Sequence, residues 1–373
     1  MSDSTPLRLA TRGSELARRQ AATVKSALED RHVEVEIVEM ETTGDAVRDE
    51  LIHRLGKTGA FVRTLDEAVL EGDVDAAVHS MKDMPTEQPD ELVVAGVPER
   101  AAPGDVLVTP DGTELKDLPK GATVGTGSLR RGAQLRAHRP DLNVEALRGN
   151  VDTRVEKLLA PVVQAEHERR SDAEAERKEE IERDTQTEEE IEGTPDGEFD
   201  ESVEEWFMGL SEIERRAAER EVETEYDAIV LAAAGLERTG LRHHVGTSDL
   251  PTDEFVPAAG QGALAVTAAD DEVVERLQSV LDHPRSRAET AVERTVLAEV
   301  GGGCIAPIGV HAHLRGDRIH TVARVLSTDG TEEAKLTRDL PAETYDAAAR
   351  ELAADLREKG AADLIDAARE AES

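Results

Sequence analysis

The stretch DAAVHSMKD, residues 75–83, indicates the fold more clearly than any other part of this sequence. Its first five residues form a short, mostly apolar run before a polar turn, which is typical of a buried strand. A similar stretch, DAIVL at residues 227–231, also leads into a loop and a helix start. The two stretches predict two units of the same kind, each built around such a strand.

Strands and helices alternate around these two stretches. This order predicts α/β domains with mostly parallel sheets, in which ligands bind beyond the carboxyl ends of the strands. After Pro284 the pattern changes to a helix, a glycine-rich loop, a strand pair and a final helix, which predicts a smaller α+β domain. Further candidate strands occupy residues 7–10, 33–40, 123–125 and 144–147, and candidate helices occupy residues 15–29, 65–70 and 129–137.

Length and composition are those of a globular protein with more than one domain. The chain has 373 residues, of which 38% are apolar and only 2% aromatic, and two or three domains are expected at this length. The sequence has no signal-peptide pattern in its first 20 residues and no apolar run long enough to span a membrane. Its one cysteine excludes an intrachain disulfide, so we expect a cytoplasmic protein.

The chain is strongly acidic, with 81 acidic against 44 basic residues and a formal net charge of −37. Such a surface repels nucleic acids and anionic membranes, so we expect neither as a partner. Many carboxylates, few aromatic residues and only nine lysines are the composition expected of a halophilic protein. Concentrated salt screens the repulsion between its surface charges.

Residues 165–225 exaggerate this acidity, with 25 acidic and 8 basic side chains. Glutamate and arginine dominate the segment, and few residues in it can form a core. We interpret it as an insertion that is part solvated helix and part disordered chain. Its few apolar residues, Trp206, Phe207, Met208 and Ile213, form a weak cluster that is able to dock locally, but a solvated tether is the simpler role.

Cys304 lies in the stretch GGGCIAPIG, residues 301–309. Three glycines before the cysteine leave the backbone around its sulfur bare, and glycine permits the close approach of a bulky group. A thiol presented in this way favours an attachment point or a nucleophile. A buried free cysteine near a turn is the alternative that these residues leave open.

Lys82 and Asp83 follow directly on the candidate strand at residues 75–79. A carboxylate at the carboxyl end of a strand is well placed to stabilise a cation or to transfer protons. A simple surface ion pair between the two side chains is the alternative.

Arginines recur at strand ends and helix starts. A guanidinium group can hold a carboxylate through two parallel hydrogen bonds, and the backbone N–H groups of a helix start also favour anions. Their joint placement predicts a receptor for a polyanion. Phosphate is the rival ligand, although the sequence has no P-loop with its lysine. These arginines are Arg12, Arg130, Arg131, Arg148 and Arg154.

Six motifs, taken in chain order, are similar to those of one known family. They are ATR at 10–12, HSMKD at 79–83, GTGSLRR at 125–131, LRGNV at 147–151, PAAGQG at 257–262 and GGC at 302–304. Together they resemble the hydroxymethylbilane synthase (porphobilinogen deaminase) family. The resemblance covers nearly the whole chain except the acidic segment.

The resemblance implies a transferase of porphyrin and haem biosynthesis. Such an enzyme joins four porphobilinogen molecules head to tail, with release of ammonia, to give hydroxymethylbilane on a dipyrromethane cofactor held by a thioether to Cys304. Asp83, with Lys82, is the implied catalytic carboxylate, which stabilises the positive charge left when ammonia departs. No metal is expected. The implied cofactor-binding residues are Arg12, Ser14, Lys82, Thr126, Ser128, Arg130, Arg131, Arg148, Gly149, Arg154 and Gln261.

The resemblance also implies two domains like those of type II periplasmic binding proteins, with the site between them. Domain 1 is expected at 1–99 plus 255–282, with the catalytic aspartate. Domain 2 is expected at 100–254, with the acidic insertion at about 161–225. A third domain, 283–373, is expected to carry the cysteine. We expect a monomer.

Two positions depart from the family pattern. Thr58, in a stretch at 57–61 that has the glycines of a mobile lid, stands where a basic residue is frequent. Gly127 stands where serine is frequent, which removes one hydroxyl contact.

Two other kinds of function fit parts of the sequence. A non-catalytic binding protein for a dicarboxylate would use the arginines but would have no use for Cys304. An acidic interaction scaffold would explain residues 165–225 but not the ordered arginines.

Overall fold

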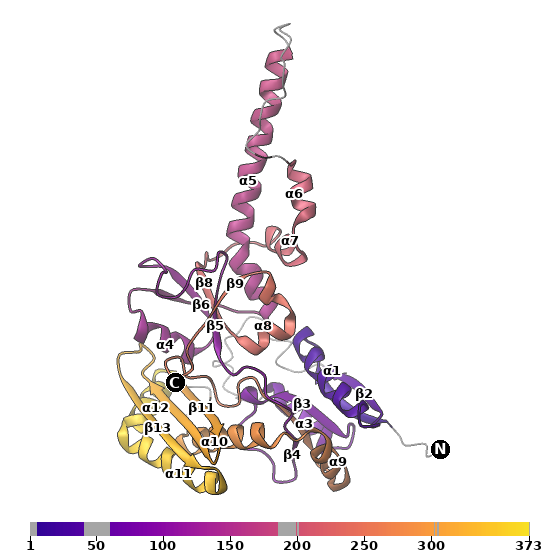
Figure 1. Ribbon diagram of the computed structural model, residues 1–373, viewed down its shortest axis with the longest axis vertical. Helices are drawn as coiled ribbons and strands as arrows, with labels where there is room; N and C mark the ends of the chain where they lie inside the picture. The colour runs from indigo at the N-terminus through magenta and orange to yellow at the C-terminus, as the bar shows by residue number, and fades with distance from the viewer. Residues whose placement is uncertain are drawn as a thin grey trace.

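The computed structural model describes residues 6–40, 60–185, 199, 201–301, 303 and 306–372. Within these ranges the chain forms two five-stranded sheets and one three-stranded sheet. Figure 1 shows the three sheets as the centres of three bodies, with a long helical arm projecting from one of them. This is the α/β architecture with a smaller C-terminal α+β domain that the sequence predicted.

The first sheet has the strand order β2-β1-β3-β10-β4. Strands β1, β2 and β3 run parallel, whereas β10 lies antiparallel between β3 and β4. Helix α1 (Glu15–Glu29) connects β1 to β2 and places Val24 and Leu28 in the core with Leu9. The strands are β1 (Leu7–Arg12), β2 (Val35–Met40), β3 (Ala76–Ser80), β4 (Val93–Gly96) and β10 (Leu264–Ala268).

The second sheet repeats this arrangement in the order β7-β6-β8-β5-β9. Strand β6 pairs in parallel with β7 and β8, and β5 lies antiparallel between β8 and β9. Helix α4 (Leu129–His138) follows β6, and α8 (Ala233–Thr239) follows β8. The strands are β5 (Asp105–Thr109), β6 (Thr123–Thr126), β7 (Asn143–Ala146), β8 (Ala228–Ala232) and β9 (Gly246–Asp249).

The chain crosses between these two sheets twice, once from β4 to β5 and once from β9 to β10. Strand β10 therefore completes the first sheet only after the whole of the second sheet has been formed in sequence. This is the arrangement of type II periplasmic binding proteins, and the expected fold class is confirmed. The two crossings, 97–104 and 250–263, run from one sheet to the other and carry residues of the site.

The third sheet is an antiparallel meander of β11 (Ile308–Arg315), β12 (Arg318–Leu326) and β13 (Glu333–Pro341). Its core cluster includes Val296, Ile319 and Leu352. The helices of this domain are α10 (Pro284–Val300), α11 (Tyr345–Leu356) and α12 (Ala362–Glu372), and α9 (Asp271–Leu281) precedes them against the first sheet.

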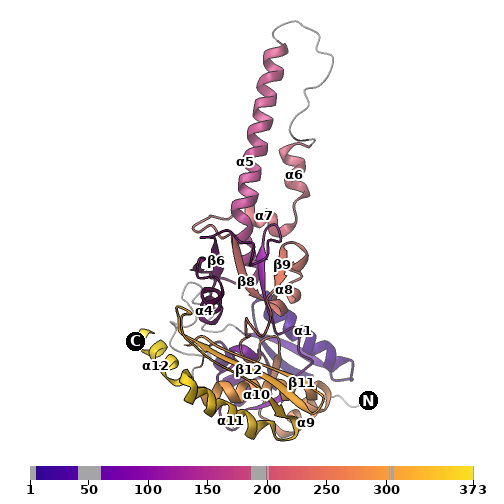
Figure 2. The same cartoon turned by 60° about the vertical axis from the view of Figure 1, so that its left-hand side comes forward.

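The described residues of the acidic segment belong to the arm. Helix α5 (Val151–Thr185) runs straight out of the second domain, and α6 (Val203–Gly209) and α7 (Glu212–Ala218) pack back along it (Figures 1 and 2). Reciprocal capping boxes, Ser202 with Glu205 and Ser211 with Glu214, start the two short helices. None of the described helices has both the length and the apolar character needed to cross a bilayer.

The expectation of a solvated tether is wrong for the described part of the segment that returns to the body. Ile213 is 5% exposed and Ala217 is fully buried, and both belong to the apolar cluster that contains Leu158 of α5. Gln164 of α5 donates hydrogen bonds to carbonyl groups at the end of α7. Composition favoured the tether over local docking because the segment has few apolar residues, but a few of them, correctly spaced, are enough to dock a short helix.

We expect Ile213→Ala to lower the free energy of unfolding by about 2–5 kcal/mol, because a buried aliphatic side chain leaves a cavity. Met208, which is 73% exposed on α6, provides the matched control, and Met208→Ala should change stability by less than about 0.5 kcal/mol. Fluorescence of the single tryptophan, Trp206 of α6, during denaturant unfolding measures both variants. Equal stability of the two variants would contradict the docking of α7.

Candidate active site

A short 3-10 turn, Met81–Asp83, directly follows β3 and carries both expected catalytic side chains. Met81 and Met84 are 2% and 4% exposed, and the Met81 N–H donates to the carbonyl of Ala263. These contacts fix the turn against the first domain. Lys82 and Asp83 face outward as an ion pair, with 2.8 Å between Nζ and Oδ1.

Arg12 and Ser14 lie at the same edge of the first sheet. Arg12 is the last residue of β1, which runs parallel to β3, so the carboxyl ends of both strands meet at this edge. Ser14 caps the start of α1 and accepts a hydrogen bond from the Ala17 N–H. The structure thus brings Arg12, Ser14, Lys82 and Asp83 to one edge, as the sequence predicted.

A buried ion network lies at the corresponding edge of the second sheet. The Asp105 carboxylate, at the start of β5, is 2.8 Å from a guanidinium nitrogen of Arg130 and 2.8 Å from one of Arg131. Gln261, on the crossing from β9 to β10, donates from Nε2 to Asp105 Oδ1 at 2.8 Å. Arg130 also donates to the carbonyl of Val256 at 2.7 Å. The network joins α4 and β5 to the second crossing.

This network changes the interpretation of three expected ligand-binding residues. Arg130, Arg131 and Gln261 are 4%, 7% and 1% exposed, and their polar groups are engaged with Asp105. In the structure they therefore connect the two domains, and a direct contact with a ligand's carboxylates stays a prediction. Asp105 could not be identified from the sequence, because its partners are 25, 26 and 156 residues away in the chain and meet it only in the fold.

The charge state of Asp105 follows from its neighbours. Burial by itself raises the pKa of this carboxyl, but the charges of Arg130 and Arg131 and their hydrogen bonds outweigh it and lower the pKa to about 2. The carboxylate is therefore ionised at neutral pH.

Arg148, Gly149 and Arg154 form a second cationic group beyond β7. Arg154, in the first turn of α5, donates from Nε to the carbonyl of Gly149 at 2.7 Å. Burial, and secondly the charge of Arg131, lower the pKa of Arg154 to about 10. Neither Arg148 nor Arg154 has a carboxylate partner among the residues that the structure describes. A partly buried guanidinium without a carboxylate partner favours the binding of an anion.

Thr126, Gly127 and Ser128 form the floor beside these arginines. Thr126 Oγ1 accepts from the Ser128 N–H at 3.2 Å, and Ser128 caps α4 through the Arg131 N–H. A Cβ at Gly127 would lie 2.7 Å from the Leu147 carbonyl oxygen and 3.4 Å from a nitrogen of Arg154. Glycine at this position therefore lets the ends of β6 and β7 approach each other. The departure from serine at position 127 thus has a steric reason.

The two edges face each other across contacts between α1 and α8. Arg19 of α1 donates to the Arg238 carbonyl at 3.2 Å, and Arg238 donates to the Gly262 carbonyl at 2.8 Å. The charge of Arg131 acts on Arg154, and Arg131 donates to Gln261 Oε1 at 3.3 Å. A Cβ at the adjacent Gly260 would lie 2.8 Å from Met81 Cγ. The turn of Lys82 and Asp83 and the cationic group are therefore connected through the second crossing.

Cys304 lies outside the described residues, as do Thr58 and most of the expected lid at 57–61. The ends of the cysteine loop are described. Gly301 ends α10 in the left-handed conformation, with φ at 85°. At the other end, a Cβ at Gly309 would lie 2.4 Å from the Val256 carbonyl oxygen, so β11 begins against the segment that accepts Arg130.

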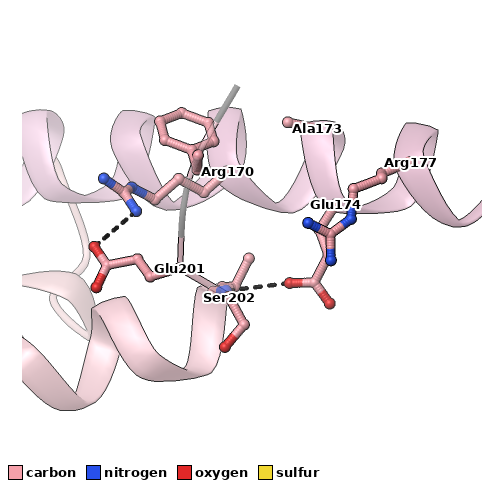
Figure 3. Close-up of a pocket in the computed structure, with 8 residues that line it drawn as sticks. Arg170, Ala173, Glu174, Arg177, Glu201 and Ser202 are labelled. Atoms are coloured by element: carbon pink, nitrogen blue, oxygen red, sulfur yellow. Dashed lines mark hydrogen bonds and ion pairs between the residues drawn. The ribbon is translucent and has the colours of Figure 1, made fainter. Parts of the chain in front are cut away.

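A pocket elsewhere on the molecule does not belong to this region. It lies on the arm, between α5 and residues 199–203 (Figure 3). Its charged lining residues bind one another, since Arg170 pairs with Glu201 at 3.1 Å and Glu174 accepts from the Val203 N–H. These contacts hold the arm together. The described residues also contain no cluster suited to a metal ion.

Comparison with known proteins matches the chain to two family models. The model of the porphobilinogen deaminase dipyrromethane cofactor-binding domain matches residues 7–166 and 211–276, and that of the porphobilinogen deaminase C-terminal domain matches residues 288–359. The longest unmatched stretch, 167–210, falls in the acidic segment. These matches define an enzyme with a cofactor-binding domain and a separate C-terminal domain.

Curated relatives extend this match over the whole chain. A probable porphobilinogen deaminase of Halobacterium salinarum is 57% identical and covers 98% of this chain and 99% of its own length. One of Methanococcoides burtonii is 39% identical over 96% of this chain and 95% of its own. The chain belongs to the porphobilinogen deaminase family. The dicarboxylate-binding protein and the acidic scaffold are therefore wrong as alternatives.

Among solved structures, a YaeC-family lipoprotein of Enterococcus faecalis covers 75% of this chain and 92% of its own, with 14% identity and a TM-score of 0.35. A similarity at this level does not bear on function.

We expect acid to weaken the protein through Asp105. An unfolded aspartate has a pKa near 3.8, against about 2 in the fold, so the stabilisation is complete above about pH 4 and is lost as the pH falls towards 2. The difference corresponds to roughly 2 kcal/mol. Asp105→Asn should remove this pH dependence and should itself cost about 3–5 kcal/mol by leaving two buried cations without a partner.

Denaturant unfolding at pH 6 and at pH 3 measures this effect, with Asp90→Asn, an exposed carboxylate, as the control. An Asp105→Asn variant with the same pH dependence as the control would exclude the network as its source.

Proposed function

We propose that this chain catalyses the reaction of its family through the residues assembled between its two α/β domains. Four porphobilinogen molecules are joined head to tail, with loss of ammonia, to give hydroxymethylbilane. The observation that carries the assignment is the presence of two kinds of group at the strand ends of the two sheets. Asp83 is an outward-facing carboxylate beyond β3, and Arg148 and Arg154, beyond β7, lack a carboxylate partner among the described residues.

The residues present fit a dipyrromethane cofactor. Its pyrrole rings carry acetate and propionate groups, and the desolvated guanidinium of Arg154 is suited to bind such carboxylates. Arg148 belongs to the same cationic group, and Arg12 is a further cation at the edge of the first sheet. A side chain at Gly127 would approach the Arg154 guanidinium, so glycine leaves room beside it. When bound, the cofactor supplies the pyrrole end to which substrate units are added.

Cys304 is the proposed point of attachment. It is four residues from Ile308, and four residues of chain span at most about 14 Å. Ile308 starts β11, which lies against the Val256 segment and so against the Arg130 network. A cofactor on Cys304 can therefore reach both the arginines and the catalytic turn.

Asp83 is the proposed catalytic carboxylate, and Lys82 orients it. Loss of ammonia leaves a positive charge on the substrate, and the attacked ring also becomes positive before it loses a proton. A fixed carboxylate stabilises both charges and can accept the proton. Lys82 donates to Asp83 Oδ1 and leaves the second oxygen to face the substrate.

Ser14, Thr126, Ser128 and Gly149 are proposed to act mainly through the backbone. The Ser14 and Ser128 side chains cap helices whose first N–H groups face the same region, and such N–H groups favour anionic ligands. Gly149 has φ at 112°, which other residues adopt only with strain. Its carbonyl orients Arg154. Arg130, Arg131 and Gln261 are proposed to support the cofactor through the fixed positions of α4 and the second crossing.

The proposal includes a monomeric, cytoplasmic enzyme with porphobilinogen as its substrate. The net charge of −37 speaks against nucleic-acid partners. Sedimentation in concentrated salt tests the oligomeric state.

The intact protein should have a mass that exceeds its sequence by two pyrrole units, because the cofactor is covalently bound. Cys304→Ala should have the bare sequence mass and no activity. Mass spectrometry of both proteins measures this. An active enzyme whose mass equals that of its sequence would reject the attachment to Cys304.

We expect Asp83→Asn to keep the mass excess but to lower kcat by about 10²–10³, since loss of one charge-stabilising group costs about 2.7–4 kcal/mol in polar active sites. Glu114→Gln, which removes an exposed carboxylate paired with Lys116, is the control and should keep the wild-type rate. Rates come from porphobilinogen consumption. If Asp83→Asn matched the control, Asp83 would have no role in the chemistry.

A further inference from the structure

Helix α10 connects the third domain to the catalytic turn. It is the helix that ends at Gly301, immediately before the cysteine loop. Two adjacent residues near its end, Glu293 and Arg294, both contact the first domain. Neither residue belongs to the motifs discussed above, so neither could be singled out from the sequence.

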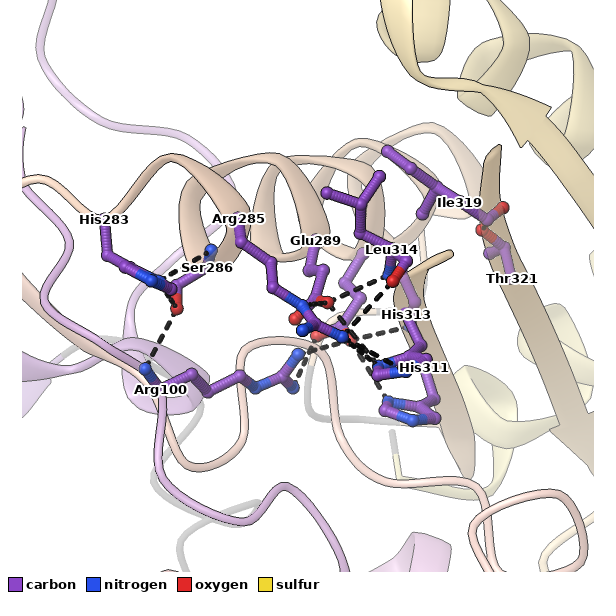
Figure 4. A network of polar contacts seen from close by, with 12 residues as sticks. Arg100, His283, Arg285, Ser286, Glu289, His311, His313, Leu314, Ile319 and Thr321 are labelled. Carbon is purple, nitrogen blue, oxygen red and sulfur yellow. Dashed lines mark hydrogen bonds and ion pairs between the residues drawn. The ribbon is translucent and has the colours of Figure 1, made fainter. Parts of the chain in front are cut away.

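Glu293 fixes the helix at a buried ion pair. It is fully buried and accepts two hydrogen bonds of 2.9 Å from Arg100, on the first crossing between the domains. It also accepts from the N–H groups of Gly260 at 2.7 Å and Ala312 at 2.8 Å. Figure 4 shows Arg100 directed at α10 from the side opposite to β11 and β12. The helix therefore has a defined position against both crossings and the third sheet.

Arg294 uses this position to bind the backbone of the catalytic turn. Its guanidinium donates to the Pro85 carbonyl at 2.7 Å and lies 3.5 Å from the carbonyl oxygens of Met81 and Met84. Burial lowers the pKa of Arg294, and none of the described carboxylates pairs with it. Partial burial of a cation costs free energy unless the cation is hydrogen-bonded. The carbonyl groups of this turn are the partners that offset this cost for Arg294.

The three carbonyls lie on both sides of Asp83 in the chain. Met81 precedes it, and Met84 and Pro85 follow it, so a single planar guanidinium holds both flanks of the residue. The second crossing also packs closely against the turn, since a Cβ at Gly260 would lie 2.8 Å from Met81 Cγ. Little freedom is left to the Asp83 backbone.

We propose that Arg294 is a positioning residue for Asp83, and that α10 holds the catalytic turn at a fixed distance from the loop that begins at Gly301. Seven residues of helix, about 10 Å, separate Arg294 from Gly301. The inference rests on the proposed function, because it matters only if Asp83 acts on a chain attached at Cys304. Placement errors of about 1 Å can cost about 10²-fold in rate.

A second arginine of the same helix provides a matched control. Arg287 donates to the carbonyls of Val94 and Ala95 in β4 at 3.1 and 3.2 Å, and it pairs with Asp282. It therefore also docks α10 to backbone carbonyls of the first domain, but it does so away from the catalytic turn. Arg294→Gln and Arg287→Gln remove comparable contacts, and only the first affects the turn.

The test measures kcat, KM, thermal stability and intact mass for Arg294→Gln, Arg294→Lys and Arg287→Gln. We expect Arg294→Gln to keep the cofactor mass and to lower kcat about 10–100-fold with less than about a threefold change in KM. Arg294→Lys, which keeps the charge but loses the planar fork, should have an intermediate kcat. Arg287→Gln should lose stability but keep the wild-type kcat.

Several outcomes would overturn the inference. They are a wild-type kcat in Arg294→Gln, an equal loss of kcat in Arg287→Gln, or loss of the mass excess in Arg294→Gln, which would assign Arg294 to cofactor loading. If Arg294→Gln does not fold, the Arg294→Lys variant decides, since a wild-type kcat there also rejects the role. Failure of the proposed function is distinct, because the wild-type protein would then not consume porphobilinogen.

Discussion

The relative position of the two α/β domains depends on the ion network around the buried carboxylate of Asp105. Two arginines of α4 and a glutamine of the second crossing converge on it, and each is almost fully buried. Ionised groups in the interior are tolerated only when they are paired and hydrogen-bonded. The network therefore specifies one arrangement of β5, α4 and the crossing, and this arrangement places the ends of β6 and β7 opposite the catalytic turn.

This constraint divides the arginines of the region into two groups. Arg130 and Arg131 neutralise Asp105 and hold the structure together, whereas Arg148 and Arg154 are left without a described carboxylate partner. The second group is the one that we propose binds the acidic substrate in a protein of net charge −37. A second buried ion pair, Arg100 with Glu293, fixes α10 of the third domain against the first crossing. The Asp105 network fixes α4 of the second domain against the second crossing in the same way. The two networks together bring three domains to one region.

The arm belongs to the most acidic segment of the chain, lies outside the candidate active site and is folded. Its apolar residues are few, but three of the seven aromatic side chains of the chain, Phe199, Trp206 and Phe207, lie there. Arg170 stacks on Phe199 and Trp206, and α7 docks on α5. The arm is thus a folded extension of the second domain.

The sequence by itself determined the element order, the fold class and the family. Strand–helix alternation depends on local apolar patterns, and the family motifs are short and contiguous. It also placed Asp83 and the arginines at the ends of strands. Only the tertiary structure decided which arginines are buried ion-pair partners and which remain available, because Asp105 and Arg130 meet through sheet order. For the same reason it alone revealed Arg294, whose acceptors lie more than 200 residues away in the chain.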